Sequence, residues 1–133
     1  MNRPFRLQVS LAVCLAATVV LHAEAADRMR PGQWAGTTVV GGKTFPNLSC
    51  ITQADADAMN GDAKAVQGYL EKTIPPEICK ISNVKVDGST IVYSASCSGQ
   101  PPRVITTAFH GTSSEGNDSS GTKTEAKLVG ACK

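Results

Sequence analysis

The stretch VKVDGSTIVY, residues 84–93, decides the fold. Apolar β-branched residues stand on both sides of Asp87-Gly88, and an Asp-Gly pair between two such runs is a strong local signal for a β-hairpin. The strand-like pattern extends outward to Cys79 on one side and to Cys97 on the other. We therefore predict two antiparallel strands between these cysteines, joined by a tight turn.

Further strands are predicted before and after this hairpin. Residues 33–40 and 43–50 have the pattern of two short strands joined by a glycine turn. Pro46 makes the second of these an edge strand or an irregular one, because proline has no N–H to donate to a neighbouring strand. Residues 104–109 and 122–129 are predicted to form the last two strands.

Two helices are predicted in the segment between the second strand and Cys79. Thr52 followed by Asp55 is a typical helix start, and Asn60-Gly61 is a typical helix end. A second helix is predicted to begin soon afterwards and to stop before Pro75-Pro76, because proline cannot continue a helix. Its apolar stripe at helical spacing consists of Ala63, Val66, Tyr69 and Leu70.

Together these elements predict a β-rich α+β fold. Every strand connection except the helical one is short enough for neighbouring strands to pair antiparallel. We therefore expect a curved antiparallel meander sheet, open or partly closed, with the helical insertion after the second strand. The polar, glycine-rich segment 111–121 is expected to be a mobile loop.

The first 25 residues have the pattern of a cleavable signal peptide. Residues 1–6 are basic, residues 7–21 are almost entirely apolar, and small residues follow at the positions that a signal peptidase reads. We predict cleavage after Ala25, which leaves one domain, residues 26–133, in the periplasm or outside the cell. The apolar run is too short for a retained membrane anchor, and the valine before Cys14 disfavours lipid attachment there.

The charge balance disfavours two classes of partner. The chain has 13 basic and 11 acidic residues, and cleavage would remove Arg3, Arg6 and Glu24, so the remaining domain is close to neutral. Because it has no basic block, we expect neither nucleic-acid binding nor binding to an anionic membrane surface. A protein or a small molecule is the expected partner.

The cysteines outside the leader are Cys50, Cys79, Cys97 and Cys132. An even number in an exported chain predicts two disulfides, whereas a zinc site would need closely spaced cysteines or a histidine pair. We favour Cys50 with Cys79, which would tie together the ends of the helical segment, and Cys97 with Cys132. The main competing pairing joins Cys79 to Cys97, which face each other if the hairpin loop has three residues.

Several landmarks in their order and spacing resemble one family. They are Arg30-Pro31-Gly32-Gln33-Trp34, Cys50-Ile51-Thr52, Cys79, Asp87-Gly88, Cys97 and Gly130-Ala131-Cys132. The sequence resembles the bacterial exported proteins grouped as domain of unknown function 3617, over nearly all of the chain after the leader. The resemblance implies an exported β domain with disulfides and an unassigned activity, and it carries over no catalytic residue.

The sequence predicts no catalytic set, cofactor or metal site. His110 is the only histidine outside the leader, so a Ser-His-Asp or Cys-His mechanism would depend on it. Asp55, Asp57 and Asp62 are interpreted as helix caps and solvated charges. Trp34 is interpreted as a core anchor rather than a platform for stacking a ligand.

Two functions follow from these patterns. The first is a non-enzymatic module of the cell envelope that binds a partner through its sheet face or concave interior. The alternative is a small hydrolase that uses His110 and nearby acids. We favour the first, because the residues do not form a recognisable reacting set.

Overall fold

The computed structural model of the protein describes residues 27–133, and the predicted signal peptide lies outside these residues. Helices α1 (Gln53–Met59) and α2 (Ala63–Thr73) follow the second strand, as the sequence predicts. The strands are β1 (Gly32–Val40), β2 (Lys43–Ile51), β3 (Cys79–Asp87), β4 (Thr90–Cys97), β5 (Arg103–Phe109), β6 (Ser113–Asp118) and β7 (Lys123–Gly130).

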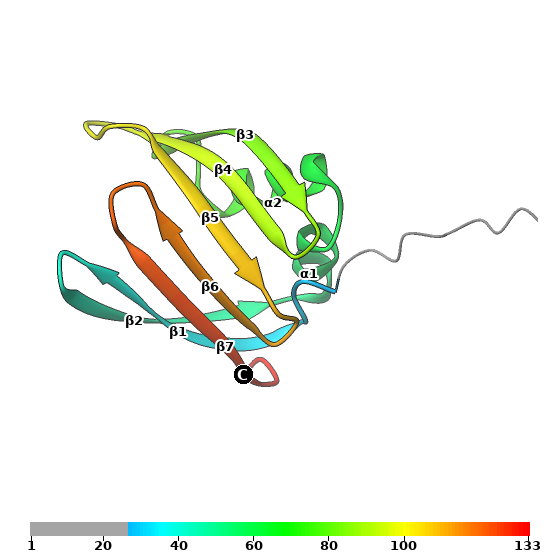
Figure 1. Ribbon diagram of the computed structural model, residues 1–133. Coiled ribbons are helices and arrows are strands. Elements are labelled where there is room, and N and C mark those ends of the chain that lie inside the picture. The colour runs from blue at the N-terminus through cyan, green and yellow to red at the C-terminus, as the bar shows by residue number, and fades with distance from the viewer. Residues whose placement is uncertain (1–26) are drawn as a thin grey trace, which may run out of the picture.

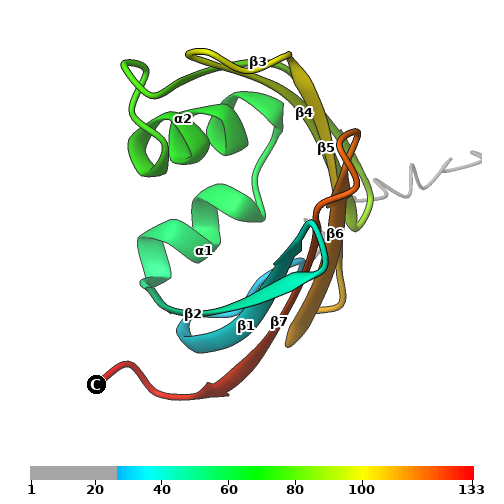
Figure 2. The ribbon, with the colours of Figure 1, turned by 90° about the vertical axis from the view of Figure 1, so that its left-hand side faces the viewer.

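The strands form one antiparallel sheet in the order β2-β1-β7-β6-β5-β4-β3. Strands β3 to β7 follow one another as a meander, and the β1–β2 hairpin joins this meander where β1 pairs with β7. The sheet is strongly curved but not closed, and β2 and β3 are its edges (Figure 2). The predicted meander is confirmed, and so is the edge position that Pro46 indicates.

Both helices lie on the concave side of the sheet (Figure 1, Figure 2). Helix α2 packs against β3, and α1 packs against α2. Helix α1 begins at a capping box, in which the Thr52 side chain accepts a hydrogen bond from the Asp55 backbone N–H and the Asp55 side chain accepts one from the Thr52 N–H. Asp62 caps α2. The helix starts are therefore fixed locally, as the sequence predicts.

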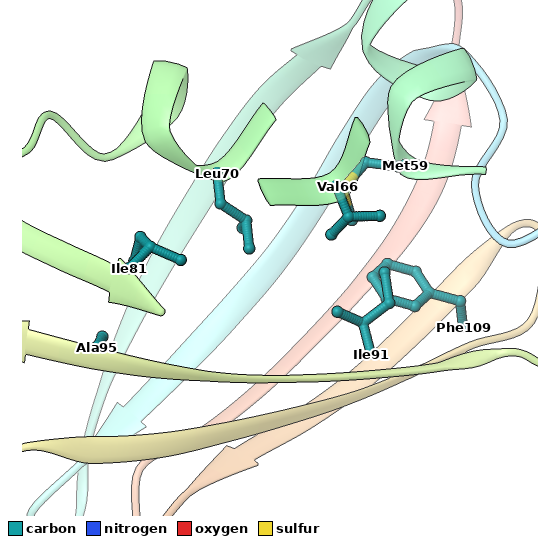
Figure 3. Close-up of a cluster of buried hydrophobic side chains, with 7 residues drawn as sticks. All are labelled: Met59, Val66, Leu70, Ile81, Ile91, Ala95 and Phe109. Carbon is teal, nitrogen blue, oxygen red and sulfur yellow. The ribbon is translucent and has the colours of Figure 1, made fainter. Parts of the chain in front are cut away.

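The main core lies between α2 and the strands next to it (Figure 3). Its buried residues are Met59, Val66, Leu70, Ile81, Ile91, Ala95 and Phe109. A second cluster joins Ala56 of α1 to Trp34 and Ile51. Trp34 is only 3% exposed, and its indole N–H donates to the Arg30 carbonyl at 2.9 Å. The core role predicted for Trp34 is confirmed.

Strand β6 corrects the prediction of a mobile loop at residues 111–121. It runs through this segment and pairs with β5 on one side and with β7 on the other. Its sequence, SSEGND, contains no large apolar residue, so the alternation that marks a half-buried strand is missing. The strand is instead held by backbone hydrogen bonds to both neighbours.

The disulfides join Cys79 to Cys97 and Cys50 to Cys132. The favoured pairing of Cys50 with Cys79 and of Cys97 with Cys132 is therefore wrong. Cys50 lies on β2 and Cys79 lies on β3, which are the opposite edges of the sheet. Cys50 instead reaches Cys132 across the end of β1, the strand that separates β2 from β7.

The Cys79–Cys97 bond depends on a β-bulge rather than on a three-residue loop. Asp87 pairs with Thr90, so the hairpin loop contains only two residues. The register then shifts between Ser82 and Lys85, where Asn83 adopts a positive φ of 54°. This extra residue in β3 brings Cys79 opposite Cys97.

Arg28 connects three separate parts of the chain from a buried position. It is 4% exposed, and its guanidinium donates hydrogen bonds to the carbonyl oxygens of Met59, Gly61 and Gly88. Met59 ends α1, which has no basic residue in its own last turn. Arg28 therefore supplies the positive charge that a helix C-terminus favours, and it fixes the α1–α2 connection to the β3–β4 hairpin.

Replacing Gly32 by alanine is expected to lower the free energy of unfolding by about 2 kcal/mol. Gly32 has a φ of +138°, and an added Cβ would lie 2.6 Å from the Gly130 carbonyl oxygen and 2.6 Å from a methyl carbon of Leu128. Both the backbone strain and the steric overlap destabilise the folded state. Urea unfolding followed by circular dichroism measures the change.

Gly68→Ala is the matched control for this substitution. Gly68 lies inside α2, and a Cβ there would meet no atom within 4 Å. Alanine at this position is expected to raise the free energy of unfolding by about 0.5 to 1 kcal/mol. A Gly32→Ala variant that is as stable as the wild type would contradict the close approach of β1 and β7.

Candidate functional site

The concave side of the sheet is only partly covered by the helices. They lie over β3 and β4 and over the end of the sheet where β1 begins (Figure 1, Figure 2). At the other end, the β1–β2 hairpin leaves Val40 45% exposed and Phe45 52% exposed. We call this helix-free part of the concave side the trough.

One row of side chains crosses the floor of the trough. Phe109 of β5 belongs to the core, and alternate residues of a strand share a face, so Thr107 also points to the concave side. The register continues from Thr107 across β6, β7, β1 and β2. We call this set the threonine row, and it consists of Thr107, Gly116, Thr124, Thr38 and Phe45.

Gly116 allows the two threonine side chains on either side of it in the threonine row to come close to its Cα. A Cβ at this position would lie 2.8 Å from Thr124 Oγ1 and 3.0 Å from Thr107 Oγ1, so the two hydroxyl groups approach the glycine from either side. Neither hydroxyl makes a hydrogen bond to another group in residues 27–133. In this part of the chain, every fully buried side-chain nitrogen or oxygen atom of a residue that is not exposed has a hydrogen-bond partner. Both hydroxyls are therefore accessible to solvent and available to a ligand.

A second glycine, Gly36, extends this polar floor. A Cβ on Gly36 would lie 2.9 Å from Asn47 Oδ1 and 2.9 Å from the Cβ of Ala126. The amide nitrogen of Asn47 donates to Thr38 Oγ1 at 3.3 Å. A Cβ on Gly36 would also overlap the Glu125 carbonyl oxygen, so this glycine permits the close approach of β1 to β7. The side chains of this floor carry hydroxyl and amide groups, and none of these groups is charged.

The trough includes a cavity of about 210 Å³ beside the threonine row. It is lined by Tyr93, Ile105, Thr107, Asn117, Asp118, Thr122 and Thr124. Burial raises the pKa of Tyr93, and the negative charge of Asp118 raises it further. The phenol of Tyr93 therefore stays protonated at neutral pH and offers a hydrogen-bond donor to the cavity.

Asp118 holds the β6–β7 turn at the wall of this cavity. Burial pushes the pKa of Asp118 upward, but hydrogen bonds from Ser120 and from the Thr122 backbone outweigh burial and lower the pKa to about 2. Oδ1 accepts from the Ser120 N–H at 2.8 Å and from the Thr122 N–H at 3.1 Å. Oδ2 accepts from Arg103 at 3.4 Å. The carboxylate is ionised and already engaged by the protein.

Acid is expected to remove roughly 1 to 2 kcal/mol of stability through Asp118. Because its folded pKa of about 2 lies below the ordinary value, the contribution is complete above about pH 4 and is lost as the pH falls through 2. Urea unfolding of wild type and Asp118→Asn at several pH values measures this. The difference between the two proteins should shrink in acid, and a constant difference would contradict the assignment.

His110 lies outside the trough, beside Glu115. Its Nε2 is 3.6 Å from Glu115 Oε1, and the two side chains are 55% and 69% exposed. Ser113 and Glu125 are close by in the same shallow depression. Within the described residues the ring makes no hydrogen bond to a hydroxyl group, so the structure brings His110 next to a carboxylate but not to an activated nucleophile. The hydrolase alternative stays a prediction without support.

The other candidates from the sequence have structural roles. Asp55 and Asp62 cap the two helices, and Asp57 accepts a hydrogen bond from the Gln53 side chain at 2.8 Å. Within residues 27–133 no group of three His, Cys, Asp or Glu side chains is placed to hold a metal ion. In the same range no helix is long and apolar enough to cross a membrane.

Sequence reasoning missed the threonine row. Its members come from five strands, and they share a face only because of the cross-strand register. Gly116 lies in the segment that was expected to be a loop. The only local signal is the small size of Gly36 and Gly116 within strands, which indicates a close approach of backbone or ligand.

The family comparison covers nearly all of the described residues. Residues 29–132 match a family described as "Protein of unknown function (DUF3617)". The chain belongs to the DUF3617 family. The resemblance inferred from the tryptophan, cysteine and glycine landmarks is confirmed. The family's description names no activity. No curated protein and no solved structure matches the chain.

Proposed function

We propose that this DUF3617 protein is an exported, non-enzymatic module of the cell envelope that binds a small ligand in the trough. The observation that carries the proposal is the pair of hydroxyl groups of Thr107 and Thr124, which approach Gly116 and have no hydrogen-bond partner within the described residues. Ligand sites are concave and place a few polar groups so that they converge on one point. The trough has both properties.

The position of the trough also supports binding. The two helices bury the apolar residues of β3 and β4, whereas β6 and the first four residues of β7 have no large apolar residue to bury. A larger side chain in place of Gly116 would collide with the hydroxyl groups of Thr107 and Thr124. The floor therefore has the shape and polarity of a ligand site, whereas a hydrophobic core without a cover would carry apolar side chains.

Two disulfides support the export part of the proposal. Disulfides of this kind form and persist in oxidising compartments such as the periplasm. Cell fractionation, with the leader residues 1–25 deleted as a comparison, tests this part. Recovery of the full-length chain in the reducing cytoplasm with free thiols would contradict export.

Native mass spectrometry tests ligand binding directly. The protein is mixed with the small-molecule fraction of an envelope extract and desalted, and retained molecules are detected as added mass. Wild type is expected to retain a ligand. Thr107→Trp places a large side chain into the trough and should abolish retention.

Thr106→Trp is the matched control. Thr106 is the neighbouring residue on β5, and it points to the convex side. This variant should retain the ligand as wild type does. Equal retention by both tryptophan variants, or no retention by wild type, would overturn the proposed site.

A further inference from the structure

We infer that the ligand of the trough is a neutral saccharide of about two sugar units. This inference rests on the proposed function and adds the chemical class of the ligand. It follows from three properties of the threonine row, which are its hydroxyl groups, its lack of charge and the exposed aromatic ring at one end.

The hydroxyl and amide groups of the floor match the groups of a sugar. A threonine hydroxyl can donate one hydrogen bond and accept others, and so can each hydroxyl of a sugar. Thr107 and Thr124 offer two such groups on either side of Gly116. Asn47, beside Gly36, adds an amide carbonyl oxygen as an acceptor. A ligand that carries several neighbouring hydroxyls can satisfy these groups together.

The floor also lacks the charges that an ionic ligand would need. No residue of the threonine row is ionisable. Among the charged side chains beside the row, Arg103 and Asp118 bind each other at 3.4 Å, while Arg103 also donates to Gln100, and Lys43 lies at the tip of the β1–β2 hairpin, where it pairs with Val40. An anion or a cation over Thr107, Gly116 and Thr124 would lose its hydration without gaining a partner of opposite charge in the threonine row. An uncharged polar ligand avoids this loss.

Phe45 supplies an apolar surface at one end of the row. Its side chain lies on the edge strand β2 in the same cross-strand row as Thr38, and it is 52% exposed. An exposed aromatic face binds apolar C–H surfaces such as one side of a sugar ring. Strands lie about 4.8 Å apart, and Phe45 is two strands from Thr124 and four from Thr107, so roughly 10 to 20 Å separate Phe45 from the two hydroxyl groups. This span suits two linked sugar rings better than one.

Amide NMR titration of the folded protein with maltose and with cellobiose tests the inference. At least one disaccharide is expected to shift the signals of Thr38, Gly116 and Thr124. The double variant Thr107→Val with Thr124→Val keeps the β-branched shape but removes both hydroxyls. It should bind the disaccharide at least about tenfold more weakly, because two hydrogen bonds are lost. Phe45→Ala should weaken binding as well.

Thr106→Val is the control, because this residue lies on the convex side of the same strand. It should leave the affinity unchanged. Unchanged affinity of the double variant, or the absence of shifts in the trough with either sugar, would overturn the saccharide inference. Octanoate and inorganic phosphate serve as apolar and anionic probes. If one of them binds in the trough and neither sugar does, the saccharide class is wrong while the proposed binding function stands.

Discussion

Removing the disulfide between Cys50 and Cys132 is expected to lower the free energy of unfolding by about 4 to 5 kcal/mol. The two residues are 82 positions apart, so the bond closes a loop over most of the described chain. A cross-link restricts the unfolded chain more strongly when the loop is longer. The bond also ties edge strand β2 to the chain after β7, so its loss frees the C-terminus.

The second disulfide provides an internal comparison. Cys79 and Cys97 are only 18 positions apart, and its removal is expected to cost about 3 kcal/mol. Urea unfolding of the two double alanine variants measures both effects. Non-reducing peptide mapping of the wild type establishes the pairing independently. A Cys50–Cys79 peptide, or a larger loss for the shorter loop, would contradict the account.

Replacing Arg28 by methionine is expected to destabilise the protein by about 3 kcal/mol or more. Methionine fills a similar volume but leaves the carbonyl oxygens of Met59, Gly61 and Gly88 without their donor. Each unsatisfied buried group costs about 1 to 3 kcal/mol, and water entering the site can recover part of this. Arg28→Lys should not restore the stability of the wild type, because a single ammonium group cannot reproduce the planar arrangement of the guanidinium donors.

Arg30→Met is the matched control for this experiment. Arg30 is two residues away, its side chain is 58% exposed, and its ion pair with Asp27 lies at the surface. Its replacement is expected to change stability by less than about 1 kcal/mol. Both variants are compared by urea unfolding. Similar small effects for Arg28 and Arg30 would show that the buried network does not stabilise the fold.

Local signals in the sequence predicted most of the fold. The Asp87-Gly88 turn, the Thr52 cap and Pro46 each act through a few neighbouring residues, and the structure confirms all three. The α+β class follows from the order of these elements. Because such features need no knowledge of the partner strand, they can be read from a single chain.

The predicted disulfide pairing was wrong because the register between two strands is not set by residues that are neighbours in the sequence. Ile81, Val84 and Val86 all face the core, although Ile81 and Val84 are separated by an odd number of positions. A regular strand would place them on opposite faces, so this spacing indicates a β-bulge. Reading the spacing in this way would have favoured Cys79 with Cys97. The bond to Cys132 could not be found, because it depends on β1 pairing with β7.

Strand β6 and the trough escaped prediction for one shared reason. A strand whose concave side faces an open trough needs no apolar residues, so SSEGND resembles a loop. The same lack of apolar residues leaves Thr124 exposed and Gly116 and Thr107 half-buried. A site built from small neutral groups on several strands has no spacing motif, whereas metal sites and phosphate loops do.

The most direct test of the binding trough is an amide NMR map of the protein mixed with the small molecules extracted from its own compartment. The account predicts shifts concentrated at Thr38, Thr107, Gly116 and Thr124 on the concave side, and their disappearance in Thr107→Trp. Shifts confined to the convex side around Thr106 and Glu115, or shifts that persist in Thr107→Trp, would contradict it.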